Sequence, residues 1–75
     1  MENHLENVLV FATNIKTDND KQKIINTLDD HSEIHEWNID QEDIDCVLRI
    51  VTNTLSEEHI IHLINLHDFT CAALE

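Results

Sequence analysis

The segment NIKTDNDKQKI (residues 14–24) joins a stretch typical of a β-strand to a stretch typical of a helix. The preceding run, NVLVFATNI (residues 7–15), is rich in β-branched and aromatic residues, and its length suits a central strand. In the following run, DNDKQKIINTLDDH (residues 18–31), Ile24, Ile25 and Leu28 have helical spacing and share one face. The first part of the chain therefore predicts a strand followed closely by a helix.

The junction itself has the sequence of a helix start. Thr17-Asp18-Asn19-Asp20 has the T-x-x-D form of a capping box, in which the Thr17 hydroxyl accepts a hydrogen bond from a backbone amide and Asp20 reaches back. Asp18 and Asp20 also complement the positive end of the helix dipole. Starting the helix is a sufficient role for these residues, so the loop needs no ligand to explain it.

The remainder of the chain continues this alternation of elements. We expect an edge strand in IHEWNI (residues 34–39), a central strand in IDCVLRIVT (residues 44–52), a helix in SEEHIIHLINLHDF (residues 56–69) and a short last strand in TCAAL (residues 70–74). The order βαββαβ with right-handed crossovers predicts an antiparallel sheet of strand order 4-1-3-2 with both helices on one face. We therefore expect one ferredoxin-like α+β sandwich over residues 1–75.

The chain contains no Gly and no Pro. A turn that needs a positive φ must therefore use Asn or Asp, which tolerate this region better than other side chains. Breaks between elements are expected at Asn14, Asn19, Asp30, Asp40, Asp43, Asn53 and Asp68. Phosphate-binding loops built on glycine are excluded.

Three stretches resemble the heavy-metal-associated domain, the fold of copper chaperones and of the N-terminal modules of metal-pumping ATPases. They are Ile24-x-x-x-Leu28, IHEWNID (residues 34–40) and TLSEEHIIHLINLHDF (residues 54–69), which ends at Asp68-Phe69 where the family has a Gly-aromatic turn. The likeness covers nearly the whole chain. WNIDQEDIDCVLRI (residues 37–50) is also similar to small uncharacterised bacterial proteins of this degenerate type.

The metal motif of that family is missing from this chain. The family binds soft metals through M-x-C-x-x-C, and the resemblance places its Met and two Cys at Ile15, Thr17 and Asp20. Copper(I) selects thiolate or thioether ligands, so a hydroxyl and a carboxylate cannot replace them. We therefore expect the fold without the metal chemistry of the family, and no cofactor.

Histidines provide an alternative metal hypothesis. His59 and His62 lie one turn apart and project away from the apolar stripe of the second predicted helix, with Glu58 nearby. Such a pair can form a surface zinc or nickel site, although two ligands without a third bind weakly. The alternative function is therefore residual metal binding or metal sensing through these histidines and neighbouring carboxylates.

One face of the predicted sheet has no helix to cover it. The pattern of the family turns the following apolar residues toward the helices: Val8, Val10, Ala12, Leu48 and Ile50. The opposite parity places a second apolar set on the open face: Leu9, Phe11, Val47 and Val51. An exposed apolar patch of this kind marks an interaction surface, so a protein partner or self-association is expected there.

The charge of the chain restricts its partners. Sixteen acidic and four basic residues give a net charge of −12, which repels nucleic acid and anionic lipid. The acidic turn DQEDID (residues 40–45) could instead face a basic protein. The polar start MENHLEN (residues 1–7) is unlike a secretory signal, and no apolar run approaches the ~20 residues that span a bilayer. A cytoplasmic, soluble protein is expected.

Two cysteines complete the set of reactive side chains. In the predicted sheet, Cys46 and Cys71 lie on strands that flank the first strand, roughly 10 Å apart, which is too far for a disulfide. Cys46 shares its parity with Leu48 and Ile50 and is expected in the core. We find no nucleophile and base at a useful spacing, so the sequence predicts a non-catalytic interaction module.

Overall fold

In the computed structural model, which describes residues 7–74, the chain forms four strands and two helices in the order βαββαβ. Their bounds are β1 Asn7–Thr13, α1 Asp18–Asp29, β2 Glu36–Asp40, β3 Val47–Thr52, α2 Glu57–Asn65 and β4 Cys71–Ala73. The sheet has the order β2-β3-β1-β4, and each neighbouring pair is antiparallel. This is the predicted order 4-1-3-2 read from the other edge, so the ferredoxin-like fold is confirmed.

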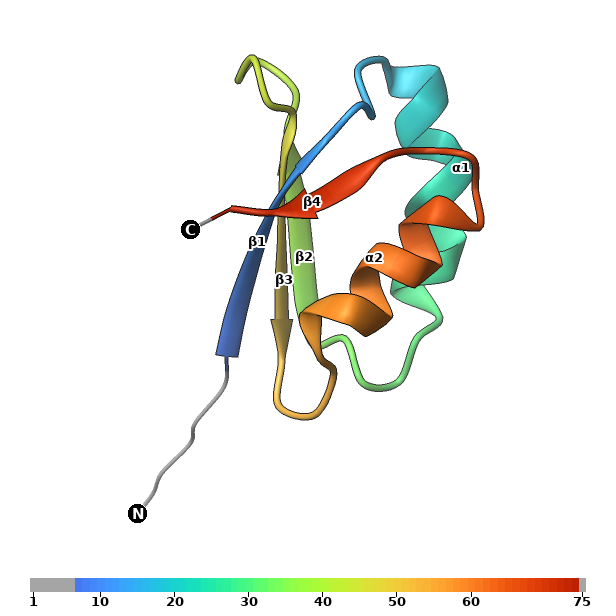
Figure 1. Ribbon diagram of the computed structural model, residues 1–75. Coiled ribbons are helices and arrows are strands. Elements are labelled where there is room, and N and C mark those ends of the chain that lie inside the picture. Colours follow the sequence, from blue (N-terminus) through green and yellow to red (C-terminus); the bar gives the residue numbers. More distant parts are fainter. Residues whose placement is uncertain (1–6, 75) are drawn as a thin grey trace.

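The molecule has two layers. Both helices lie on the same side of the sheet, and no helix or strand within residues 7–74 covers the other side (Figure 1). We call this uncovered side the open face. Its existence follows from the topology, because both crossovers have to run on the same side of the sheet.

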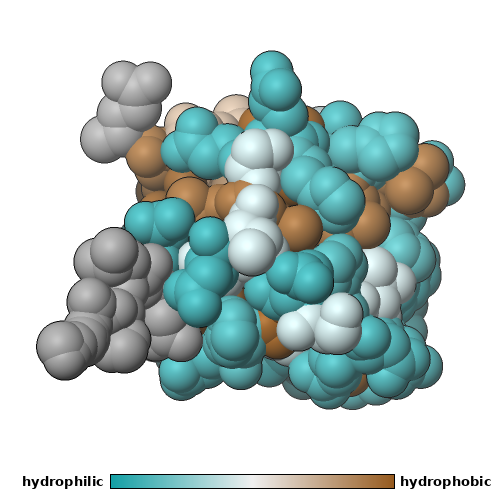
Figure 2. All heavy atoms as spheres, turned by 90° about the horizontal axis from the view of Figure 1, so that it is seen from below, coloured by the Kyte–Doolittle hydropathy of each residue, from teal (hydrophilic) through white to brown (hydrophobic). Residues whose placement is uncertain are grey.

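The core fills the space between the sheet and the helices. Its buried members are Phe11, Ile15, Ile24, Leu28, Ile34, Leu48, Ile50, Ile60 and Ile64. From below, the surface is mainly hydrophilic, with smaller apolar patches between the polar side chains (Figure 2). A short chain thus concentrates its large apolar residues between the two layers.

The predicted facing of β1 is wrong by one residue. Phe11 lies opposite Leu48 and Leu9 opposite Ile50, and directly paired residues of antiparallel strands share a face. Phe11 is fully buried and Leu9 packs against the core, so both point toward the helices. A shift by one residue exchanges every side chain between the faces of a strand, and β1 is apolar on both.

The predicted positions of Val47 and Val51 hold. Both alternate with the buried residues of β3 and are half-buried on the open face. Val8, which pairs with Val51, and Val10, which pairs with Arg49, share this face in place of Leu9 and Phe11. The predicted apolar surface therefore exists, but its β1 half consists of the other residues.

All six elements are shorter than predicted, and for β3 and α2 the cause is the turn beside them. β3 begins at Val47, three residues after Ile44, and Cys46 in front of it has a φ of 43°. α2 ends at Asn65, and Asp68 beyond it has a φ of 68°. Asp68 confirms that an acidic residue replaces glycine at such a turn, whereas Cys46 was expected to be an ordinary strand residue.

Candidate functional site

The loop between β1 and α1 is used to start the helix. The Thr17 hydroxyl accepts a 3.0 Å hydrogen bond from the Asp20 amide, and Asp20 Oδ2 accepts one of 3.3 Å from the Thr17 amide. The capping box predicted from the sequence is therefore confirmed. Asp20 Oδ2 also accepts a 3.2 Å hydrogen bond from the Lys16 amide.

These hydrogen bonds stabilise the ionised form of the Asp20 carboxylate. Desolvation raises its pKa, but the amides of Lys16 and Thr17, together with the Thr17 hydroxyl, outweigh this effect and lower the pKa from its ordinary value. The ionised carboxylate is thus the form that the cap stabilises. Its oxygen accepts amide protons from the same loop, which is an arrangement for capping a helix.

Ile15 and Thr17 are fixed by further contacts. Ile15, at the position that corresponds to the Met of the metal motif, is fully buried, and its amide donates a 3.2 Å hydrogen bond to Thr13 Oγ1. Gln41 Nε2, just after β2, donates a 2.7 Å hydrogen bond to the Thr17 carbonyl. The loop is therefore attached to the core and to the turn after β2 through its side chains and its backbone.

The structure pairs the histidines differently from the sequence prediction. His59 Nε2 lies 3.4 Å from His31 Nε2, and the two rings meet edge to face at a centroid distance of 5.5 Å. His67 Nε2 lies 2.8 Å from Thr27 Oγ1, which links the turn after α2 to α1. Neither pair contains His62 or Glu58. Among residues 7–74, no three His, Cys, Asp or Glu side chains gather as a metal group.

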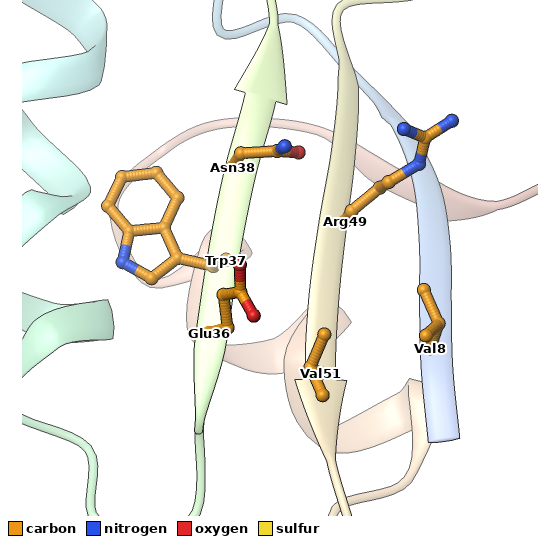
Figure 3. Close-up of a pocket in the computed structure, with 6 residues that line it drawn as sticks. All are labelled: Val8, Glu36, Trp37, Asn38, Arg49 and Val51. Atoms are coloured by element: carbon orange, nitrogen blue, oxygen red, sulfur yellow. The ribbon is translucent and has the colours of Figure 1, made fainter. Parts of the chain in front are cut away.

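The open face is hollowed on its β2 side. A depression of about 150 Å³ lies over β2, β3 and β1 and is lined by Val8, Glu36, Trp37, Asn38, Arg49 and Val51 (Figure 3). The Trp37 ring, however, projects to the opposite side of the sheet, toward α1 (Figure 3). There, its indole N–H donates a 2.7 Å hydrogen bond to Asp29 Oδ1.

The depression has an apolar end and a polar end. Val8, which is 57% exposed, pairs across the sheet with Val51, and Arg49 pairs with Asn38 on its other side. Arg49 is the only arginine of the chain, and its guanidinium is directed away from Glu36 (Figure 3). A cation beside partly exposed valines is suited to contact another protein.

Sequence reasoning missed the polar members of this face. Glu36, Asn38 and Asp40 alternate with the partly buried residues of β2, and Arg49 alternates with the buried residues Leu48 and Ile50 of β3. The alternation was a usable signal, because every second residue of a strand shares a face.

Both thiols are free, as predicted. Cys46 is buried, and Cys71 in β4 is half-buried, where desolvation raises the pKa of its thiol to about 12. Thiolates, and not thiols, act as nucleophiles and metal ligands. The protonated Cys71 therefore fits a packing role.

The helices of the described segment, residues 7–74, include none with the length and apolar character needed to cross a membrane. No protein-family model matches the chain, and no curated protein shows significant similarity to it. Conclusions about function consequently depend on the geometry of the open face, the helix cap and the histidine pair.

Proposed function

We propose that this protein is a non-catalytic protein-interaction module that binds its partner with the open face of its sheet. The observation that carries this proposal is the composition of that face, in which Val8, Val10, Val47 and Val51 surround Arg49. Protein interfaces combine an apolar centre with a polar rim and are enriched in arginine. Glu36 and Asp40 on β2, an edge strand, supply such a rim.

A second copy of the chain is the partner that the charges of this face favour. Asn38 lies opposite Arg49 on the neighbouring strand. Glu36 and Asp40 lie two residues before and after Asn38 along β2, so their Cα atoms are about 7 Å from that of Asn38. Each copy therefore offers one cation and two carboxylates on neighbouring strands. A two-fold axis between facing sheets would let Arg49 of each copy meet a carboxylate of the other, as in an isologous interface.

The resemblance to the heavy-metal-associated domain bears on how this module arose. We infer a domain that kept the fold and lost the thiolate site, since Thr17 and Asp20 are engaged in the helix cap at the corresponding positions. The high pKa of Cys71 supports a role without a thiolate nucleophile. Two free thiols suit the reducing cytoplasm, and a net charge of −12 disfavours nucleic acid and anionic membranes.

Sedimentation velocity over a range of protein concentrations tests this function. The wild-type chain is expected to form dimers, and Val8→Glu is expected to abolish them, because it puts a carboxylate into the apolar end of the open face. Ile44→Glu is the matched control: Ile44 is an aliphatic residue that is 93% exposed, but it lies in the turn before β3. This variant should dimerise like the wild type.

A wild-type chain that stays monomeric at all concentrations would exclude the second copy as partner. Equal dimerisation of wild type and Val8→Glu would exclude the open face as the interface. If the partner is a different protein, affinity capture with the wild type, Val8→Glu and Ile44→Glu tests whether the open face binds it. Only Val8→Glu should lose the captured protein. Circular dichroism of each variant shows that the fold is retained.

A further inference from the structure

The rings of His31 and His59 meet where the end of α1 approaches the start of α2. His31 comes two residues after the last residue of α1, and its carbonyl accepts a 3.1 Å hydrogen bond from the Ile34 amide. His59 is in the first turn of α2, where its amide donates a 3.2 Å hydrogen bond to Ser56 Oγ, the N-cap. The backbone of both histidines is therefore held by local hydrogen bonds.

The distance between the rings fits a shared metal ion. Zinc–imidazole bonds are about 2.0–2.1 Å long, so two nitrogens on a tetrahedral ion lie about 3.3–3.4 Å apart. The Nε2 atoms of His31 and His59 are 3.4 Å apart. The ring planes are inclined by 83°, so the rings avoid stacking on each other.

The surroundings also favour a cation. Asp30 and Glu33 flank His31 in the sequence, Glu57 and Glu58 precede His59, and all four carboxylates are exposed. Their field attracts a cation to this end of the helix layer. His59 is exposed and His31 half-exposed, so water can complete the coordination.

Without metal, hydrogen bonds determine the tautomers of the pair. The Glu33 amide donates a 3.2 Å hydrogen bond to His31 Nδ1, so the neutral His31 ring carries its proton on Nε2. This proton is donated to His59 Nε2, which must be the acceptor. A metal ion would take the place of this proton between the two Nε2 atoms. The proton would move to His31 Nδ1, which would then no longer accept the hydrogen bond of the Glu33 amide. The affinity of the pair is therefore modest.

We propose that His31 and His59 form a two-histidine site for a borderline divalent transition-metal ion, with water as the remaining ligands. Imidazole suits zinc, nickel and copper(II), whereas the hard ions magnesium and calcium prefer oxygen. The site lies on the helix layer, away from the open face, so it is independent of the proposed interaction. It would link the loop after α1 to α2.

Calorimetric titration of the full chain with Zn²⁺, in excess Mg²⁺ to occupy carboxylates, tests this site. Loss of a group that only orients a metal-bound histidine weakens binding about 10–100-fold, so His31→Gln and His59→Gln should each weaken zinc binding at least about tenfold. His62→Gln is the matched control, an exposed histidine on the same helix, and should change the affinity less than about twofold. One ion per wild-type chain is expected.

Ring resonances of the histidines in the wild-type protein provide a test that needs no variant. Zinc should shift the Nε2 signals of His31 and His59 and move the proton of His31 to Nδ1. The proposal is overturned if wild type binds no zinc, if either glutamine variant at position 31 or 59 binds like wild type, or if His62→Gln weakens binding equally.

Discussion

The Thr13 hydroxyl donates a 2.7 Å hydrogen bond to the carbonyl of Cys46, so the end of β1 is tied to the residue that precedes β3. The same hydroxyl oxygen accepts the Ile15 amide, and the Thr13 amide donates to the Asp45 carbonyl at 2.8 Å. Thr13 and Cys46 are both buried. This contact satisfies the backbone where Cys46 takes a positive φ, which is unfavourable for a residue with a Cβ.

Thr13→Val should therefore destabilise the protein although it keeps the shape of the side chain. It leaves the Cys46 carbonyl and the Ile15 amide without their partner in a buried place, at a loss of about 1–3 kcal/mol in the free energy of unfolding. Urea unfolding measures this loss. Thr70→Val, at an exposed threonine, is the control and should change stability by less than about 0.5 kcal/mol. Equal stability of both variants would contradict the role given to the Thr13 hydroxyl.

The facing of β1 gives a second prediction. Phe11 is fully buried, so Phe11→Ala should lower the free energy of unfolding by about 3–5 kcal/mol, enough to unfold much of a domain this small. Val10, its neighbour on the open face, is only half-buried, and Val10→Ala should have a much smaller effect. Circular dichroism during urea titration compares the two. A larger loss for Val10→Ala would reverse the facing of β1.

This comparison also shows why sequence predicted the elements better than their orientation. Ile24 and Leu28 mark one face of α1, because the residues around them are mostly polar. In β1, Val8, Leu9 and Val10 are apolar on both faces, so local pattern cannot select one. The selection comes from pairing with β3, where Leu48 and Ile50 alternate with the exposed Arg49. The facing of β1 can therefore be deduced from the alternation in β3, and not from the residues of β1 itself.

The candidate sites also differ in how well the sequence predicts them. The capping box of Thr17 and Asp20 was predictable because its partners are three residues apart and the chemistry is local. The pair His31–His59 joins residues 28 apart in the sequence, and its formation depends on how the helix ends pack on the sheet. His59 and His62 are closer in sequence, but sequence spacing along one helix says nothing about a ligand from another segment.

A third prediction concerns the turn after α2. Asp68 has a φ of 68°, a region that glycine enters without a steric penalty, and its carboxylate lies beyond the C-terminus of the helix, where negative charge is unfavourable. Asp68→Gly should therefore raise the free energy of unfolding by about 0.5–1 kcal/mol. Asp68→Asn removes the charge and keeps a side chain that tolerates this φ, so it separates the two effects. A stability loss in Asp68→Gly would mean that the entropy that glycine adds to the unfolded chain, or a contact of the Asp68 side chain, outweighs both gains.

The helix cap gives the last prediction, in two parts. Thr17→Ala removes the acceptor of the Asp20 amide and should lower the free energy of unfolding by about 1 kcal/mol at neutral pH. The Asp20 part depends on pH. Because the folded pKa of Asp20 is below its ordinary value of 3.8, its contribution is complete above that value and disappears as the pH falls through the folded pKa.

Urea unfolding of wild type and Asp20→Asn from neutral to acidic pH measures this contribution. The stability difference should be constant at neutral pH and should shrink below about pH 3.8, because the protonated Asp20 of the wild type loses the same charge that the variant lacks. Asp18→Asn is the matched control, since Asp18 is an exposed carboxylate of the same helical turn that takes no part in the capping box. If both variants showed the same pH profile, the effect would belong to the helix dipole in general, and the amides of Lys16 and Thr17 would not be what lowers the pKa of Asp20.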